Sequence, residues 1–92
     1  LAPDALMARA EEIARDIAAN TAAMSVAMNR QLLWKLLDAD HPRRAHKLES
    51  RGLAAALAGP DSREGAASFG ERRAPAFTGR ASDAAFMRAW WA

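Results

Sequence analysis

Few residues in this chain have the types and spacing that chemistry requires. His46 and Glu49 are three positions apart, so a helix would place them on one face, where they could hold half of a metal site. No second pair completes that site, so an ordinary surface histidine or a hydrogen-bonded one is the better interpretation. Carboxylates recur at helical spacing in Glu11, Glu12, Asp16, Glu49, Glu64 and Glu71, and solvated helix faces explain them. The sequence therefore predicts no catalytic residue and no metal ligand.

One aromatic residue and one basic residue also share a helical spacing. Phe69 and Arg72 are three positions apart, so a helix would project both from one side. An aromatic face can stack on a base, and a guanidinium binds phosphate through paired hydrogen bonds. Taken alone, the spacing favours the simpler interpretation, a core phenylalanine beside a surface arginine.

A single charge interrupts an apolar helix face. Arg30 lies within the stripe of apolar residues expected over the second helix, and a charge on such a face usually needs a partner. The partner could be acidic, with Asp16 or Glu49 in reach along the chain, or it could be a bound anion. Both interpretations stay open on the residues alone.

Composition places the chain among small, alanine-rich helical proteins. It has 92 residues, of which 51% are hydrophobic, and its net charge of +2 comes from 13 basic and 11 acidic residues. A core built from alanine buries little area per residue, so we expect it to need apolar surface from elsewhere. The absence of cysteine excludes disulfides and fits a cytoplasmic protein. No apolar run is long enough to span a bilayer, so no membrane association is predicted.

Helical periodicity runs through most of the chain, and no segment alternates as a strand would. The sequence therefore predicts an all-α fold of about four helices plus an irregular C-terminal tail. The first helix follows Pro3 and ends at Asn20-Thr21, where Thr21 can cap the second helix. The apolar stripe of the first helix is formed by Leu6, Ala10, Ile13 and Ile17.

Proline and glycine set the later boundaries. Asp40-His41-Pro42 separates the second helix from the third, with Asp40 or His41 as the cap. Gly59-Pro60 ends the third helix, with the glycine expected in the left-handed conformation. The fourth helix starts at Asp61, which has capping-box spacing to Glu64, and fades near Arg73.

Two further features predict packing. Gly52 falls on the interior face of the third helix, which predicts a close approach by the second helix near Trp34. After an extended or irregular segment at 76–82, Ser82-Asp83 can cap a last turn that carries Trp90-Trp91. Two tryptophans exposed at a terminus would be costly, so we expect both to dock on an apolar surface.

The segment 61–79 resembles a known family. It is similar to the C-terminal stretch of the enoyl-CoA hydratase/isomerase (crotonase) family, which typically reads Asp-x-x-Glu-Gly-x-x-Ala-Phe-x-Glu-Lys-Arg-x-Pro-x-Phe-x-Gly. Arg72 replaces the usual lysine, and weaker similarity extends from Leu1 to about Arg80. Positions matching in register are Asp61, Glu64, Gly65, Phe69, Glu71, Arg73, Pro75, Phe77 and Gly79.

The resemblance implies a helical C-terminal domain at 1–80 and a tail at 81–92. The family's β-containing core, with all catalytic residues, would lie outside this chain, which also opens without methionine and is expected to be a fragment or a processed product. Phe69 and Arg72 would reach the nucleotide of coenzyme A (CoA) bound to a neighbouring subunit. Arg30 would lie near CoA, and Leu53 against the acyl chain.

At the level of the whole protein, the resemblance implies a lyase that acts on acyl-CoA thioesters as a trimer or dimer of trimers. No cofactor beyond the CoA of the substrate and no nucleic acid is expected, and the fragment alone would not be catalytically competent. The alternative is a free-standing helical interaction module that binds nucleic acid through Arg43, Arg44 and Lys47.

Overall fold

The computed structural model describes residues 2–91, which form helices joined by short connections and one extended segment. A short 3₁₀ helix, η1 (Pro3–Ala5), leads into the first α-helix, and a longer one, η2 (Ala81–Trp90), follows the extended segment. The α-helices are α1 (Leu6–Asn20), α2 (Ala23–Lys35), α3 (Pro42–Ala58) and α4 (Pro60–Gly70). No strand occurs between residues 2 and 91, so the predicted all-α fold is confirmed.

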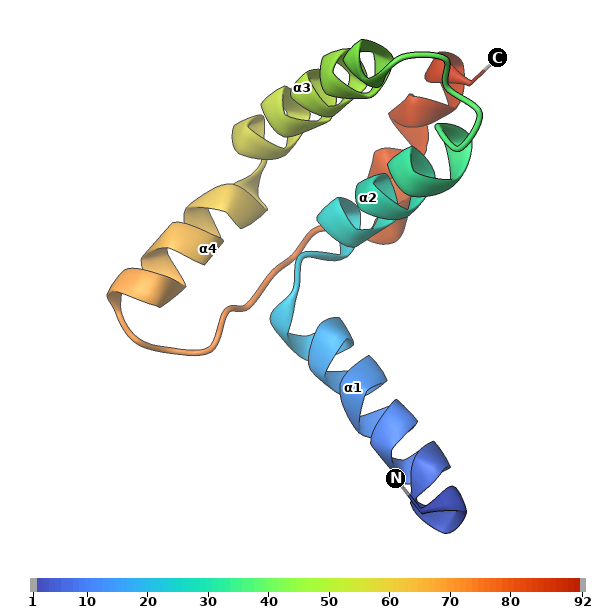
Figure 1. Cartoon of the computed structure of the whole chain (residues 1–92). Coiled ribbons are helices and arrows are strands. Elements are labelled where there is room, and N and C mark those ends of the chain that lie inside the picture. The colour runs from blue at the N-terminus through green and yellow to red at the C-terminus, as the bar shows by residue number, and fades with distance from the viewer. Residues whose placement is uncertain (1, 92) are drawn as a thin grey trace.

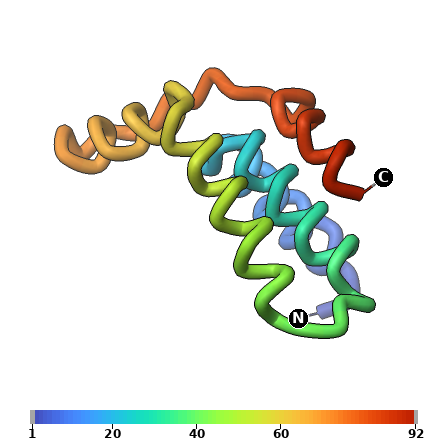
Figure 2. Tube along the Cα trace, turned by 90° about the horizontal axis from the view of Figure 1, so that it is seen from above, coloured from blue at the N-terminus to red at the C-terminus, as the bar shows by residue number. Residues whose placement is uncertain are grey.

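The helices trace an open frame rather than a closed bundle (Figure 1). Helices α2 and α3 lie side by side and antiparallel, and α4 continues beyond the end of α3 at an angle. An extended segment then leaves α4 and runs back to η2, which lies along α2 (Figure 2). The C-terminal end of α4 therefore lies at the far corner of the frame from the α2–α3 connection.

The small core lies where η2 covers α2. Met28 of α2 is buried there against Ala84 and Met87 of η2, with Trp90 and Trp91 packed beside them. The indole Nε1–H of Trp91 also donates to Gln31 Oε1 at 3.0 Å. The prediction that the two tryptophans dock on an apolar surface is confirmed, and that surface belongs to this chain. The boundary between 1–80 and 81–92 stays a prediction.

Gly52 is buried on α3 facing α2, as its position predicted. A Cβ added at Gly52 would lie 3.6 Å from Met28 Sδ, so Met28 makes the approach and the expectation of Trp34 was wrong. Trp34 instead is 65% exposed. The prediction named a residue on the wrong face of α2, because Met28 and Trp34 lie on different sides of that helix.

Local capping agrees with the sequence at one boundary and differs at two. His41 caps α3, since its Nδ1 accepts from the Arg43 backbone N–H at 3.0 Å. Thr21 does not cap α2; its hydroxyl donates to Ile17 O and so closes the end of α1. Gly59 is extended rather than left-handed, because it serves both as the C-cap of α3 and as the N-cap of α4.

Helix α1 stands away from the rest of the frame (Figure 1) and has no buried residue. Its predicted stripe is consequently exposed, with Leu6, Ile13 and Ile17 all open on the surface of the chain. Among residues 2–91, no helix is both long and apolar enough to cross a membrane.

Candidate functional site

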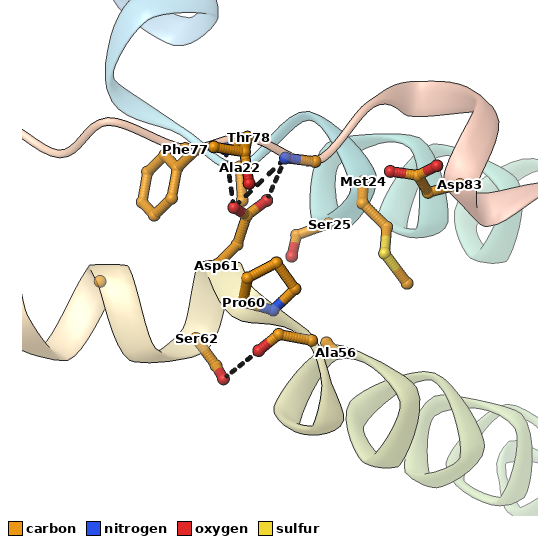
Figure 3. Close-up of a pocket in the computed structure, with 13 residues that line it drawn as sticks. Ala22, Met24, Ser25, Ala56, Pro60, Asp61, Ser62, Phe77, Thr78 and Asp83 are labelled. Carbon is orange, nitrogen blue, oxygen red and sulfur yellow. Dashed lines mark hydrogen bonds between the residues drawn. The ribbon is translucent and has the colours of Figure 1, made fainter.

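The residues matching the family motif form one connected structure around α4. Asp61, in the first turn of α4, accepts two backbone N–H groups from the returning segment: Thr78 N at 2.9 Å and Gly79 N at 3.0 Å (Figure 3). Because these residues are separated by 17 and 18 positions, the carboxylate pins the returning segment against the start of α4. A side chain at position 79 would displace this carboxylate, since an added Cβ would meet Asp61.

Glu64, one turn further along α4, holds the same segment nearer its beginning. One of its oxygens, Oε1, accepts from the Ala76 backbone N–H at 3.0 Å, and both oxygens contact the guanidinium of Arg73. The hydrogen bond from Arg73, followed by that from Ala76, lowers the pKa of Glu64 to about 2. The Arg73 side chain also donates from Nε to Glu71 Oε2 at 2.5 Å.

The predicted capping box at Asp61 and Glu64 was therefore wrong. Helix α4 begins at Pro60, its N-cap is Gly59, and no side chain caps it. The two carboxylates lie inside the first turns and face the extended segment instead of the helix end. A capping box and a pair of carboxylates facing a neighbouring segment both need acidic residues three positions apart. The spacing alone therefore does not distinguish the two arrangements.

The end of α4 is a tight turn with one left-handed residue. The Arg72 N–H donates to Phe69 O at 3.2 Å, and the Arg73 N–H reaches back to Ser68 O at 3.0 Å. Arg72 sits between these bonds with φ of 55°, in the position where helices usually place glycine. Since α4 ends at Gly70, the turn and not a helix face relates Phe69 to Arg72.

Phe69 is 87% exposed, which excludes the interpretation of a core phenylalanine within this chain. Arg72 is exposed as well, and none of the ion pairs found between residues 2 and 91 involves it. The turn thus presents an aromatic ring and an exposed guanidinium from two residues whose backbones are hydrogen-bonded to each other.

The other two predicted site residues lie elsewhere. Arg30 is exposed on α2 beside a shallow apolar groove that includes Val26 and Ala81, and the described part of the chain gives it no acidic partner. Leu53 is 59% exposed on α3, at a groove of about 190 Å³ between α2 and α3. The end of α4 points away from α2 in both views, so this chain does not bring Arg30 to the Phe69–Arg72 turn (Figures 1 and 2).

Two further hollows lie on the surface of the chain. A cavity of about 280 Å³ lies where α2, the α3–α4 junction and the returning segment meet, with Met24, Pro60 and Phe77 on its walls (Figure 3). A shallow hollow at the start of α3 is lined by His41, Arg43, Arg44 and Lys47. No group of three or more histidine, cysteine or carboxylate residues within 2–91 is arranged to hold a metal ion.

The sequence interpretation missed the functions of Asp61, Glu64 and Arg73 in shaping the turn. A signal was present, because an acid pair three residues apart on α4 precedes a segment whose alternate residues Pro75 and Phe77 turn inward. Such alternation marks an extended chain with one covered face, whose unpaired backbone N–H groups need acceptors.

Comparison with known proteins agrees with the motif, although no protein-family model matches the chain. The enoyl-CoA hydratase ACTT3 of Alternaria alternata is 42% identical over 69 residues, which is 75% of this chain and 23% of ACTT3. This chain is related to the enoyl-CoA hydratases. The enoyl-CoA hydratases AKT3-2 and AFT3-1 of the same organism are 41% and 38% identical, over 75% and 83% of this chain and 23% and 25% of their own lengths. The chain thus spans about a quarter of the curated relatives that it matches.

Proposed function

We propose that this chain is the C-terminal helical part of an enoyl-CoA hydratase/isomerase-family enzyme that acts on acyl-CoA thioesters. The observation that carries the proposal is a turn inside the segment that resembles the family. It holds the exposed Phe69 and, three positions later, Arg72, which forms no ion pair with residues 2–91. Relatives described as enoyl-CoA hydratases support the same conclusion.

In this proposal the turn binds the nucleotide end of CoA. The Phe69 ring stacks on adenine, and the Arg72 guanidinium binds a phosphate through charge-assisted hydrogen bonds. Arginine in place of the family's lysine keeps the charge and adds a second parallel donor, which suits a phosphate. As the family resemblance implies, Phe69 and Arg72 serve a nucleotide bound to a neighbouring subunit. Arg30 lies on α2, away from the end of α4, and meets CoA at a different contact (Figures 1 and 2).

Other contributions are oligomerisation and closure of the acyl pocket. Large apolar side chains remain open on α1 and α2, among them Ile13, Ile17 and Leu33, and these faces are suited to pack against further protein. Leu53 at the α2–α3 groove is placed to cover an acyl chain delivered by the rest of the enzyme. The groups that polarise the thioester carbonyl, the main electrostatic contribution to such a reaction, belong to that other part.

The test is a kinetic comparison of two substrates in the full-length enzyme. Arg72→Ala and Phe69→Ala should each raise KM for acyl-CoA with a smaller effect on kcat, the pattern of lost uniform binding. Loss of the phosphate contact should cost ~1.5–3 kcal/mol. A pantetheine thioester that lacks the nucleotide should show almost no change. Equal impairment of both substrates by Arg72→Ala would overturn the proposed contact.

The alternative, a helical module that binds nucleic acid, has one supporting observation. Arg43, Arg44 and Lys47 line one hollow at the start of α3. This patch is short, and the relatives of the chain are described as enzymes, so the CoA-binding function has the broader support. A filter-binding assay with duplex DNA and single-stranded RNA at physiological salt should show no saturable binding.

A further inference from the structure

Arg72 has an unfavourable backbone conformation. It is the one non-glycine residue between positions 2 and 91 with a positive φ, at 55°. The left-handed region brings Cβ of an L-residue too close to the following carbonyl oxygen, and glycine avoids this. Such a conformation persists where surrounding contacts over-determine it, and it is often associated with a functional site.

The contacts that hold this conformation come from the next residue. The Arg73 backbone N–H bonds to Ser68 O at 3.0 Å, while its Nε donates to Glu71 Oε2 at 2.5 Å. Its two terminal nitrogens contact the two oxygens of Glu64, with Nη2 at 3.2 Å from Oε2. Arg73 thus ties α4 to both the turn and the returning segment, and Arg72 is fixed between Phe69 and this anchor.

The two adjacent arginines consequently have different functions. Two carboxylates occupy the donors of Arg73, and their charges outweigh its own, so it offers little to a phosphate. Arg72 has no such partner among residues 2–91. Because its backbone is already ordered, phosphate binding would cost less conformational entropy there than at a free loop arginine.

We propose that Arg73 is a positioning residue for nucleotide recognition: its clamp on Glu64 and Glu71 fixes the left-handed turn that presents Arg72 beside Phe69. This inference rests on the proposed CoA contact and adds the device that orders it. Arg73 itself does not touch the ligand.

The experiment measures CoA affinity by calorimetry in the full-length enzyme, together with KM for acyl-CoA and for the truncated pantetheine thioester. Arg73→Gln removes the clamp and should weaken CoA binding by about tenfold, the loss expected for one charge-assisted contact. KM for the truncated thioester should stay within about twofold. Arg63→Gln is the matched control, because Arg63 is exposed on α4 and makes no ion pair with residues 2–91, while the substitution removes the same charge. Arg63→Gln should leave the CoA affinity and the KM for the truncated thioester within about twofold of the parent values.

A second variant keeps the proposal testable if Arg73→Gln folds poorly. Arg73→Lys retains the charge but cannot bond both oxygens of Glu64 and Glu71 at once, so CoA affinity should fall to a value between the parent and Arg73→Gln. Circular dichroism at the assay temperature checks that each variant is folded. A CoA affinity between those of the parent and Arg73→Gln, together with an unchanged KM for the truncated thioester, supports the positioning function of Arg73.

The outcomes separate this inference from the proposed function. If Arg72→Ala weakens CoA binding and both Arg73 variants do not, the clamp has no positioning function and the CoA contact stands. If Arg73→Gln impairs the intact and truncated substrates equally, Arg73 is only structural and the inference is wrong. If neither Arg72→Ala nor Arg73→Gln changes CoA affinity, the proposed contact itself fails.

Discussion

Two carboxylates on α4 act as acceptors for a distant stretch of backbone. Asp61 binds the N–H groups of Thr78 and Gly79, and Glu64 binds that of Ala76. An extended segment outside a sheet leaves such donors unpaired, which is costly wherever water is excluded. These bonds therefore give a physical reason for the two acidic residues and the glycine in the motif.

At Arg72, replacement by glycine should stabilise the protein. Arg72→Gly relieves the steric cost of a left-handed residue, about 1–2 kcal/mol, against the extra chain entropy of glycine, so the free energy of unfolding should rise by ~0.5–1 kcal/mol. Chemical denaturation of the full-length protein measures this. Arg72→Ala retains Cβ and should show no comparable gain. If glycine gave no more stability than alanine, the turn would not be strained.

At Glu64, stability should depend on pH in the acid range. Its folded pKa of about 2 lies below the ordinary value of 4.5, so ionised Glu64 stabilises the fold fully above pH 4.5. As pH falls from 4.5 towards 2, the unfolded state binds the proton first and the contribution disappears. Denaturation curves of the parent and Glu64→Gln across this range should therefore converge. A constant difference between them at every pH would contradict the coupling.

Among the elements, the α2–α3 contact depends on a small residue. The Cβ of alanine at position 52 would meet Met28 Sδ at an ordinary 3.6 Å, so Gly52→Ala should be neutral or should stabilise α3 by up to ~1 kcal/mol. Gly52→Leu places further carbons against Met28 and should destabilise by ~1–3 kcal/mol through overpacking. Thermal unfolding of the two variants measures whether each substitution raises or lowers the stability. If Gly52→Leu stabilised the protein, the groove between α2 and α3 would have room for the leucine side chain, and the overpacking argument would be wrong.

The elements themselves could be predicted from the sequence because their signals are local. Pro42 starts α3, His41 caps it, and the Gly59-Pro60 pair separates α3 from α4. Contacts between distant residues could not be predicted in the same way. Asp61 has the same spacing to Glu64 whether it caps α4 or binds Gly79, and only the three-dimensional path of the chain decides.

The candidate site was predictable in its residue types and not in its geometry. Phe69 and Arg72 were found by resemblance, while their relation through a turn depends on where α4 ends. Helix ends shift by one or two residues with tertiary context, and the end at Gly70 moves Arg72 off the helix. Arg30 and Leu53 line different grooves, so this chain does not bring them into one site.

As a whole molecule, the chain leaves much of its apolar surface open. Helix α1 buries nothing, and Leu33, Trp34 and Leu37 remain 65–75% exposed at the other end of the frame. Contiguous apolar faces of this kind usually mark contacts with other protein. The arrangement therefore fits one part of a larger assembly.

We accordingly expect the 92-residue chain to self-associate in isolation, and the full-length enzyme to form a trimer or a dimer of trimers. Sedimentation velocity over a hundredfold range of concentration measures both. A monodisperse, cooperatively folded monomer of the isolated chain at high concentration would contradict the first expectation.

If the Phe69–Arg72 turn binds the nucleotide end of CoA, that end alone should bind to the enzyme. Adenosine 3′,5′-bisphosphate carries the base and phosphate but no thioester, so it isolates this contact from the acyl pocket. Calorimetry should show saturable binding to the full-length enzyme, competitive with CoA, and a loss of about 10- to 100-fold in the Phe69→Ala/Arg72→Ala double variant. Unchanged affinity in the double variant would mean that Phe69 and Arg72 do not contact the nucleotide.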